Sequence, residues 1–131
     1  MCLTMLKISE HTLKISTAGM PPTYIYRKES KKVEELLFKA MPLGAMKKFP
    51  YELKNTTLKP GDIILLLSDG LPELENKNGE MYGYKRIRNG FGDIAEKSPQ
   101  EIVSYLKNEG AGWVNNEDPG DDVTFVVIKV K

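Results

Sequence analysis

Two acidic corners stand next to two runs of large aliphatic residues in the sequence. The run from Ile63 to Leu67 leads directly into Ser68-Asp69-Gly70, and Gly120-Asp121-Asp122 stands just before the apolar run from Val123 to Val130. Such runs are typical of strands covered on both faces, so a carboxylate at the end of one is held by stiff backbone beside the apolar layer. This pair of strand-edge carboxylates suggests a site for a hard metal ion.

Length and composition limit the remaining possibilities. A chain of 131 residues has the length of one domain with a conventional core. The net charge of +1 gives no support for a nucleic-acid or anionic-membrane partner. The single cysteine, Cys2, excludes an internal disulfide and fits a reducing compartment. Because no apolar run approaches the roughly twenty residues that span a bilayer, we expect a cytoplasmic protein without membrane contact.

The first half of the chain reads as strands separated by turns. The alternation of Leu13 and Ile15 with polar residues predicts a β-hairpin with one face exposed to solvent. The segment 33–38 is compatible with a helix or a strand, and we favour a strand. The expected strands are residues 2–8, 12–17, 23–27, 33–38, 49–57, 63–67 and 123–130.

The second half reads as helical. Residues 71–83 predict an exposed loop, and residues 84–95 predict a helix that Gly90 and Gly92 split into two short turns. Ser98-Pro99-Gln100-Glu101 carries the signature of a capping box, and the helix that follows should end at Gly110 or Gly112. The expected class is α+β, with mainly antiparallel sheets and helices in the C-terminal half.

Several motifs occur in an order that resembles a known family. They are Ala18-Gly19-Met20-Pro21-Pro22, Pro42-Leu43-Gly44, Leu58-Lys59-Pro60-Gly61-Asp62, Ser68-Asp69-Gly70-Leu71-Pro72-Glu73, Asn78-Gly79-Glu80-Met81-Tyr82-Gly83 and Asp121-Asp122-Val123-Thr124. Each motif is weak alone. Together, over nearly the whole chain, they resemble the C-terminal part of PPM-type protein phosphatases of the bacterial SpoIIE/RsbU-like branch.

The resemblance implies a fold, a reaction and a site. The fold would be part of an α-β-β-α sandwich, and the reaction would be hydrolysis of phosphoserine or phosphothreonine on a protein, with two Mn²⁺ or Mg²⁺ ions. Asp69 and Asp121 match the family's metal-ligating aspartates, while Gly70 and Asp122 hold the neighbouring positions and are further possible metal contacts. The implied substrate is a phosphorylated protein of the anti-anti-sigma-factor type.

The sequence also departs from the family. The family's N-terminal part carries another Asp-Gly motif that bridges the two metals, but no aspartate precedes residue 18 here. We therefore expect residues 1–131 to be the C-terminal portion of a single phosphatase domain, with weak or absent metal binding and no activity alone. Met20 stands where the family commonly has histidine. No residue is assigned as catalytic, and Glu73 matches a recurring acidic position without a role.

Other interpretations remain open. Asp69 and Asp121 would serve equally well as solvated turn residues if the two corners did not meet in space. The chain could be a non-catalytic interaction module, or it could form a homodimer through an exposed sheet edge. The missing N-terminal part of the domain is a further expected partner.

Overall fold

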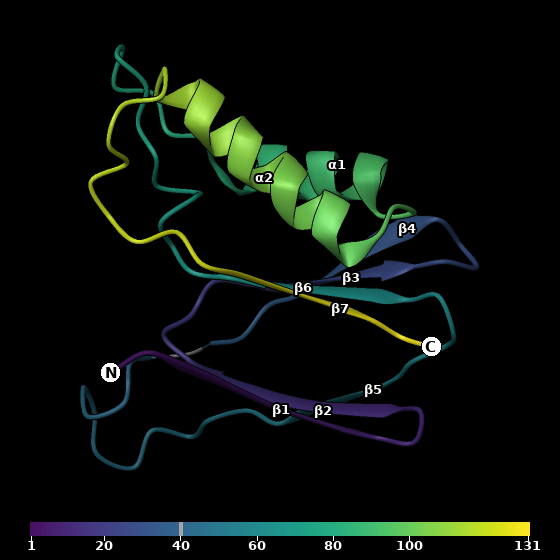
Figure 1. Ribbon diagram of the computed structural model, residues 1–131. Helices are drawn as coiled ribbons and strands as arrows, with labels where there is room; N and C mark the ends of the chain where they lie inside the picture. The colour runs from purple at the N-terminus through teal and green to yellow at the C-terminus, as the bar shows by residue number, and fades with distance from the viewer. Residues whose placement is uncertain (40) are drawn as a thin grey trace.

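Two antiparallel sheets are stacked face to face, and a pair of helices lies on the outer side of one of them (Figure 1). The computed structural model describes residues 1–39 and 41–131. The smaller sheet has the order β1-β2-β5, with β1 at Leu3–Ser9, β2 at Thr12–Ala18 and β5 at Lys54–Thr57. The larger sheet has the order β4-β3-β6-β7, with β3 at Thr23–Arg27, β4 at Lys32–Leu36, β6 at Ile63–Leu67 and β7 at Phe125–Lys129.

The helices α1 (Tyr84–Ile94) and α2 (Pro99–Trp113) pack against each other and cover one face of the larger sheet, where their backbones approach β3, β4 and β7. Alternating residues of the central strands β3 and β6 therefore point into two separate hydrophobic cores, one on each face of the larger sheet. Tyr24 and Leu65 point toward the helices and pack with Phe91 in the helix-side core, whereas Ile25 and Ile64 point toward the smaller sheet and pack in the core between the sheets. Neither helix is long and apolar enough to cross a membrane.

Arg27, at the end of β3, joins a buried carboxylate of the larger sheet to the smaller sheet. The carboxylate of Asp62, which is 2% exposed, lies 3.0 Å from the guanidinium of Arg27 on β3. Arg27 also donates to the carbonyl oxygen of Thr57 and the hydroxyl of Thr56, both on β5. Because Arg27 belongs to the larger sheet and β5 to the smaller, this cluster connects the layers.

The expected α+β class with antiparallel sheets is confirmed. The choice of a strand over a helix for segment 33–38 is also confirmed, although the strand, β4, ends at Leu36. The strand expected at 49–57 is wrong in its first half, because only Lys54–Thr57 pairs, with β2. In the unpaired half, the rings of Phe49 and Tyr51 stack edge to face, and the Tyr51 hydroxyl donates to the carbonyl of Met41.

Three expectations for the helical half need correction. The region 84–95 holds one continuous helix, α1, and Gly90 does not interrupt it. The capping box is confirmed, but α2 continues through Gly110 and Gly112 as far as Trp113. The loop 71–83 is anchored more firmly than expected, because Leu71, Leu74 and Tyr82 are buried and a bridge joins Glu75 to Met81.

Candidate metal centre

The Asp69 corner is the turn that ends β6. The carbonyl of Asp69 accepts a hydrogen bond from the amide of Glu73 at 3.1 Å, and Leu71 between them is fully buried. Burial of Leu71 in the helix-side core fixes the turn, while the Asp69 side chain stays exposed to solvent. A carboxylate thus stands in water at the end of a rigid apolar strand.

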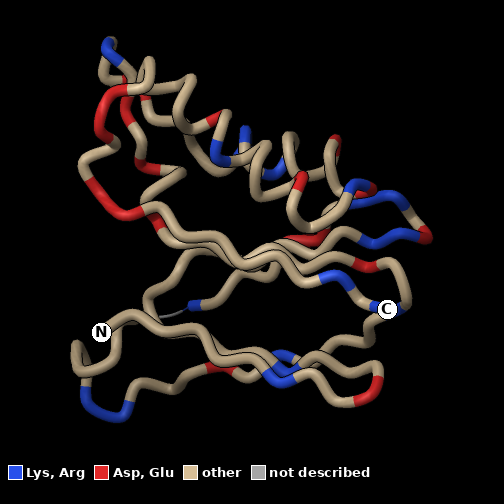
Figure 2. Tube along the Cα trace, in the orientation of Figure 1, with Lys and Arg blue, Asp and Glu red and all other residues tan. Residues whose placement is uncertain are grey.

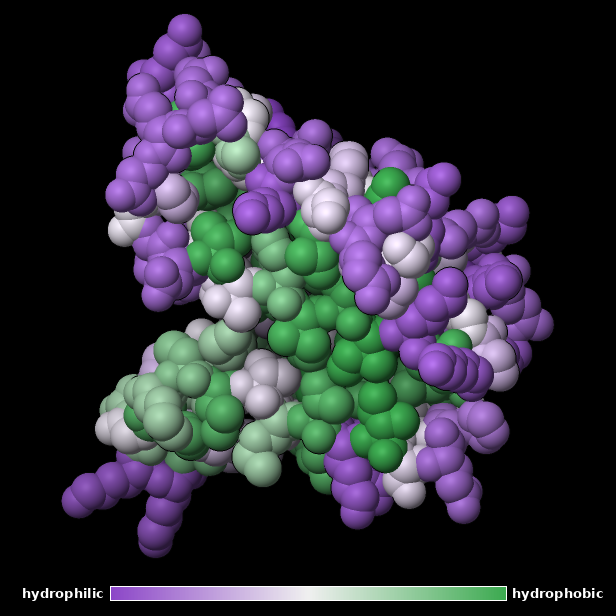
Figure 3. Space-filling view, in the orientation of Figure 1, coloured by the Kyte–Doolittle hydropathy of each residue, from purple (hydrophilic) through white to green (hydrophobic). Residues whose placement is uncertain are grey.

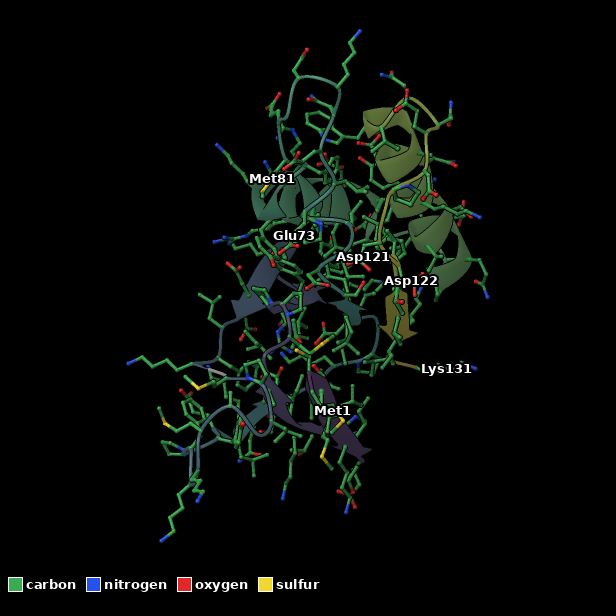
Figure 4. The ribbon with its side chains drawn as sticks, turned by 90° about the vertical axis from the view of Figure 1, so that its left-hand side faces the viewer. Met1, Glu73, Met81, Asp121, Asp122 and Lys131 are labelled. Carbon is green, nitrogen blue, oxygen red and sulfur yellow. The ribbon has the colours of Figure 1, made fainter. Side chains whose placement is uncertain are left out.

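The second acidic corner leads into β7. Gly120 has a φ of 74°, a conformation that favours glycine, and it turns the chain toward the strand. Asp121 accepts a hydrogen bond through Oδ1 from the amide of Asp122 at 2.7 Å, which holds the two residues in a local turn. Both side chains are exposed. Figure 4 shows Asp121 and Asp122 on the same face of the molecule as Glu73.

The two corners meet in the structure. The β6–β7 pairing runs to Leu67 opposite Phe125, and the next amide, of Ser68, donates to the carbonyl of Thr124 at 3.0 Å. A Cβ on Gly70 would overlap the carbonyl oxygen of Asp122, so the backbones of the corners are in contact at Gly70. The sequence predicted the two acidic corners without showing that they converge, and the chain topology supplies that convergence.

Two pockets, each of about 410 Å³, open beside the corners. Asp69 lines one of them together with Met20 and Tyr84, and Asp121 lines the other. Glu73 lines both pockets, although the sequence suggested no role for it. Its place follows from the turn, since the Glu73 amide bonds to the carbonyl of Asp69.

The surroundings of the Asp69 pocket are acidic. The pKa of the Tyr84 hydroxyl is raised, first by burial and then by the negative charges of Glu73 and Asp69. Figure 2 shows acidic segments gathered along the loops at this end of the molecule. An excess of negative charge at one place favours the approach of a cation.

The donors of this site suit a hard divalent ion in type but are too few. Carboxylate oxygens are the ligands that Mg²⁺ and Mn²⁺ prefer, and both corners present them to solvent. Within residues 1–39 and 41–131, however, no three or more His, Cys, Asp or Glu side chains gather closely enough to hold an ion. The two corners therefore form at most one side of a metal centre. Met20, where the resemblance leads one to expect histidine, adds a thioether to the pocket wall rather than a nitrogen donor.

Comparison with solved structures places this fold among the PP2C-type phosphatases. The Mn-presoaked phosphatase domain of the cell fate determinant SpoIIE from Bacillus subtilis superposes with a TM-score of 0.73 at 23% identity, over 99% of this chain and 56% of that domain. At that identity the likeness shows a shared fold.

Sequence comparison narrows the class to a family. The family described as Stage II sporulation protein E (SpoIIE) matches residues 1–131, so this chain belongs to the SpoIIE family of PPM-type phosphatase domains. Stage II sporulation protein E of Priestia megaterium is 26% identical over 98% of this chain, and the phosphoserine phosphatase RsbU of Bacillus subtilis is 29% identical over 95%. The chain spans 21% and 36% of the lengths of these two relatives.

Proposed function

We propose that this chain is the C-terminal portion of one metal-dependent domain that removes phosphate from a serine or threonine of a regulatory protein. The observation that carries the proposal is the meeting of the Asp69 and Asp121 corners at the paired ends of β6 and β7. Family membership over residues 1–131 supports the same reading. The relative RsbU is named a phosphoserine phosphatase, which supports a phosphoserine substrate.

In this proposal Asp69 and Asp121 are metal ligands. Asp122 and Gly70 lie beside them, and Gly70 acts by letting the Asp122 backbone approach closely. Bound Mn²⁺ or Mg²⁺ would supply positive charge for the phosphoryl group and make a water molecule more acidic. The chain's own contribution is to hold two carboxylates on stiff strand ends.

The remainder of the domain is the proposed partner of an open groove. A groove of about 370 Å³ lies between β1 and β7, and its lining includes Cys2, Leu6, Leu66 and Val126. Figure 3 shows apolar side chains along this edge of the sandwich and a hollow between the two layers. Since the chain covers 56% of the solved SpoIIE domain, we propose that the missing N-terminal part fills the groove and brings the bridging aspartate. Without that part we expect weak metal binding and no turnover.

The implied substrate is a phosphorylated anti-anti-sigma-factor-type protein in the cytoplasm. The test is dephosphorylation of such a phosphoprotein with Mn²⁺, first by this chain alone and then by the chain joined to the preceding half of a SpoIIE-type domain. We expect activity only after joining, and we expect Asp69→Asn and Asp121→Asn to abolish it. A joined domain that folds, binds the phosphoprotein and releases no phosphate would contradict the proposal.

A second candidate is a non-catalytic interaction module. It is favoured by one observation, the absence of a three-residue metal-ligand group among the described residues. Stable binding of a regulatory protein, with no Mn²⁺ heat in calorimetry even after joining, would select it. Pairing of two copies through the edge strand β1 is a separate possibility, which sedimentation at increasing concentration would detect.

A further inference from the structure

The Ser68 side chain bonds across the two acidic corners. Its hydroxyl donates to the carbonyl of Asp122 at 3.2 Å and accepts from the amide of Thr124 at 3.0 Å. The Ser68 amide adds a third bond, to the carbonyl of Thr124. One residue thus makes three hydrogen bonds with the three-residue stretch 122–124, which joins the second acidic corner to β7.

These bonds matter because the segment 115–124 makes few other hydrogen bonds to the rest of the protein. Apart from the bonds to Ser68, its hydrogen bonds among the described residues are local or go to the end of α2. Residues 115–122 are all exposed. Within the part of the chain that the structure describes, Ser68 is the only side chain outside this segment that bonds to it.

The position of Ser68 in the chain makes the link direct. It is the residue immediately before Asp69, so the atom that holds Asp122 is separated from the Asp69 Cα by very few bonds. The Ser68 side chain therefore adds a direct link between the two carboxylate-bearing corners, beside the backbone contact at Gly70. Alanine would remove this hydroxyl link and leave the peptide-to-peptide bond to Thr124 in place.

We propose that Ser68 is a positioning residue, whose hydroxyl fixes the Asp121-Asp122 corner at the distance from Asp69 at which both can face one cation. This inference rests on the proposed function, because it assigns the cation site to those corners. Ser68 touches no substrate in this scheme, and it acts through the backbone of residues 122–124. Groups that orient metal ligands in this way commonly change metal affinity about 10-fold to 100-fold when removed.

The test follows backbone amides of the 131-residue chain by NMR during a titration with MnCl₂. Paramagnetic broadening reports weak binding, so the test does not require turnover. In the unchanged protein we expect the Gly70 and Asp122 amides to broaden together. In Ser68→Ala we expect the Mn²⁺ concentration needed for this broadening to rise about tenfold. In Ser68→Thr, which keeps the hydroxyl, we expect that concentration to return toward the original value. Ser104→Ala, an exposed serine on α2, is the matched control and should change nothing.

Hydrogen exchange of the Thr124 amide tests the positioning role of Ser68 separately from metal binding. Faster Thr124 exchange in Ser68→Ala is expected if the hydroxyl holds the corner. Unchanged exchange, unchanged Mn²⁺ broadening in that variant, or no recovery in Ser68→Thr would each overturn the inference. If Mn²⁺ broadens neither corner of the unchanged protein, the proposed metal centre fails, and Thr124 exchange alone then decides whether the hydroxyl positions the corner.

Discussion

The two sheets of this molecule are built from similar strands but have different surroundings. In the larger sheet, β3 and β6 are buried on both faces, one face under α1 and α2 and the other against the smaller sheet. In the smaller sheet, β1 has no helix over it among the described residues, and Met5 on its outward side is 66% exposed. Both acidic corners lie at strand ends of the larger sheet, one after β6 and the other before β7.

This difference shows which part of the molecule is packed tightly enough to hold side chains in fixed positions. A site for a metal ion needs side chains on elements whose positions are locked by packing, and β6 meets that condition. The smaller sheet instead presents an open edge and an apolar groove, which is the groove that the proposed N-terminal part would fill. Substitutions in the two sheets, in the helices and at the acidic corners test this contrast.

Truncation of the helix-side core should be the most damaging change. Phe91 is fully buried between the helices and the larger sheet, so Phe91→Ala should lower the free energy of unfolding by about 3–5 kcal/mol. Met5→Ala in the smaller sheet should change it by less than about 0.5 kcal/mol. Urea denaturation measures both. Equal losses in the two variants would mean that the sheets are not distinguished by their cover.

Removal of the buried carboxylate beside Arg27 should lower the free energy of unfolding by a smaller amount. Asp62→Asn leaves Arg27 without its buried carboxylate partner, and we expect a loss of about 2 kcal/mol in unfolding free energy. Asp93→Asn, at an exposed aspartate on α1, is the control. The same denaturation measurement applies, and a loss no larger than that of the control would show that the Asp62 carboxylate adds no net stability through Arg27.

The contrast between the sheets also explains what the sequence could predict. Runs such as Ile63 to Leu67 identify doubly buried strands, and Ser98 with Glu101 identifies the start of α2, because these signals are local. The prediction that glycines would interrupt or end the helices is wrong, because their role depends on tertiary contacts and not on local sequence. Gly90 lies where a Cβ would crowd the Tyr105 ring, so it permits the close approach of α1 to α2 instead of ending a helix.

Gly110 follows the same logic, with Leu71 and Leu74 close to the place where its Cβ would be. Such tertiary contacts are invisible to local propensity. For the candidate site, the sequence supplied the acidic residues and their strand ends. It could not supply their convergence or the bonds of Ser68, since these depend on the antiparallel pairing of β6 with β7, which lie more than fifty residues apart.

Glycine substitutions test that distinction between close approach and backbone freedom. Gly70→Ala should destabilise the protein by about 1–3 kcal/mol and separate the acidic corners, because a methyl group there overlaps the Asp122 carbonyl. Gly112→Ala is the matched change in α2, where a Cβ meets nothing within 4 Å, and it should stabilise the protein by up to about 1 kcal/mol. Thermal unfolding should move the two midpoints in opposite directions, and a shift of both in one direction would contradict this account of Gly70.

The smallest expected effect concerns the pH dependence of α2, which covers the larger sheet. The pKa of Glu101 is lowered, first by the hydrogen bond from the Ser98 amide and then by the Ser98 side chain. A lowered carboxylate pKa in the folded state stabilises the fold above the pKa of the unfolded chain, and this contribution disappears as the pH falls through the folded-state value. Urea midpoints should therefore fall further in the unchanged protein than in Glu101→Gln between neutral pH and about pH 3. Parallel loss in both proteins would show that the hydrogen bonds of Glu101 with Ser98 do not contribute to the acid sensitivity of the fold.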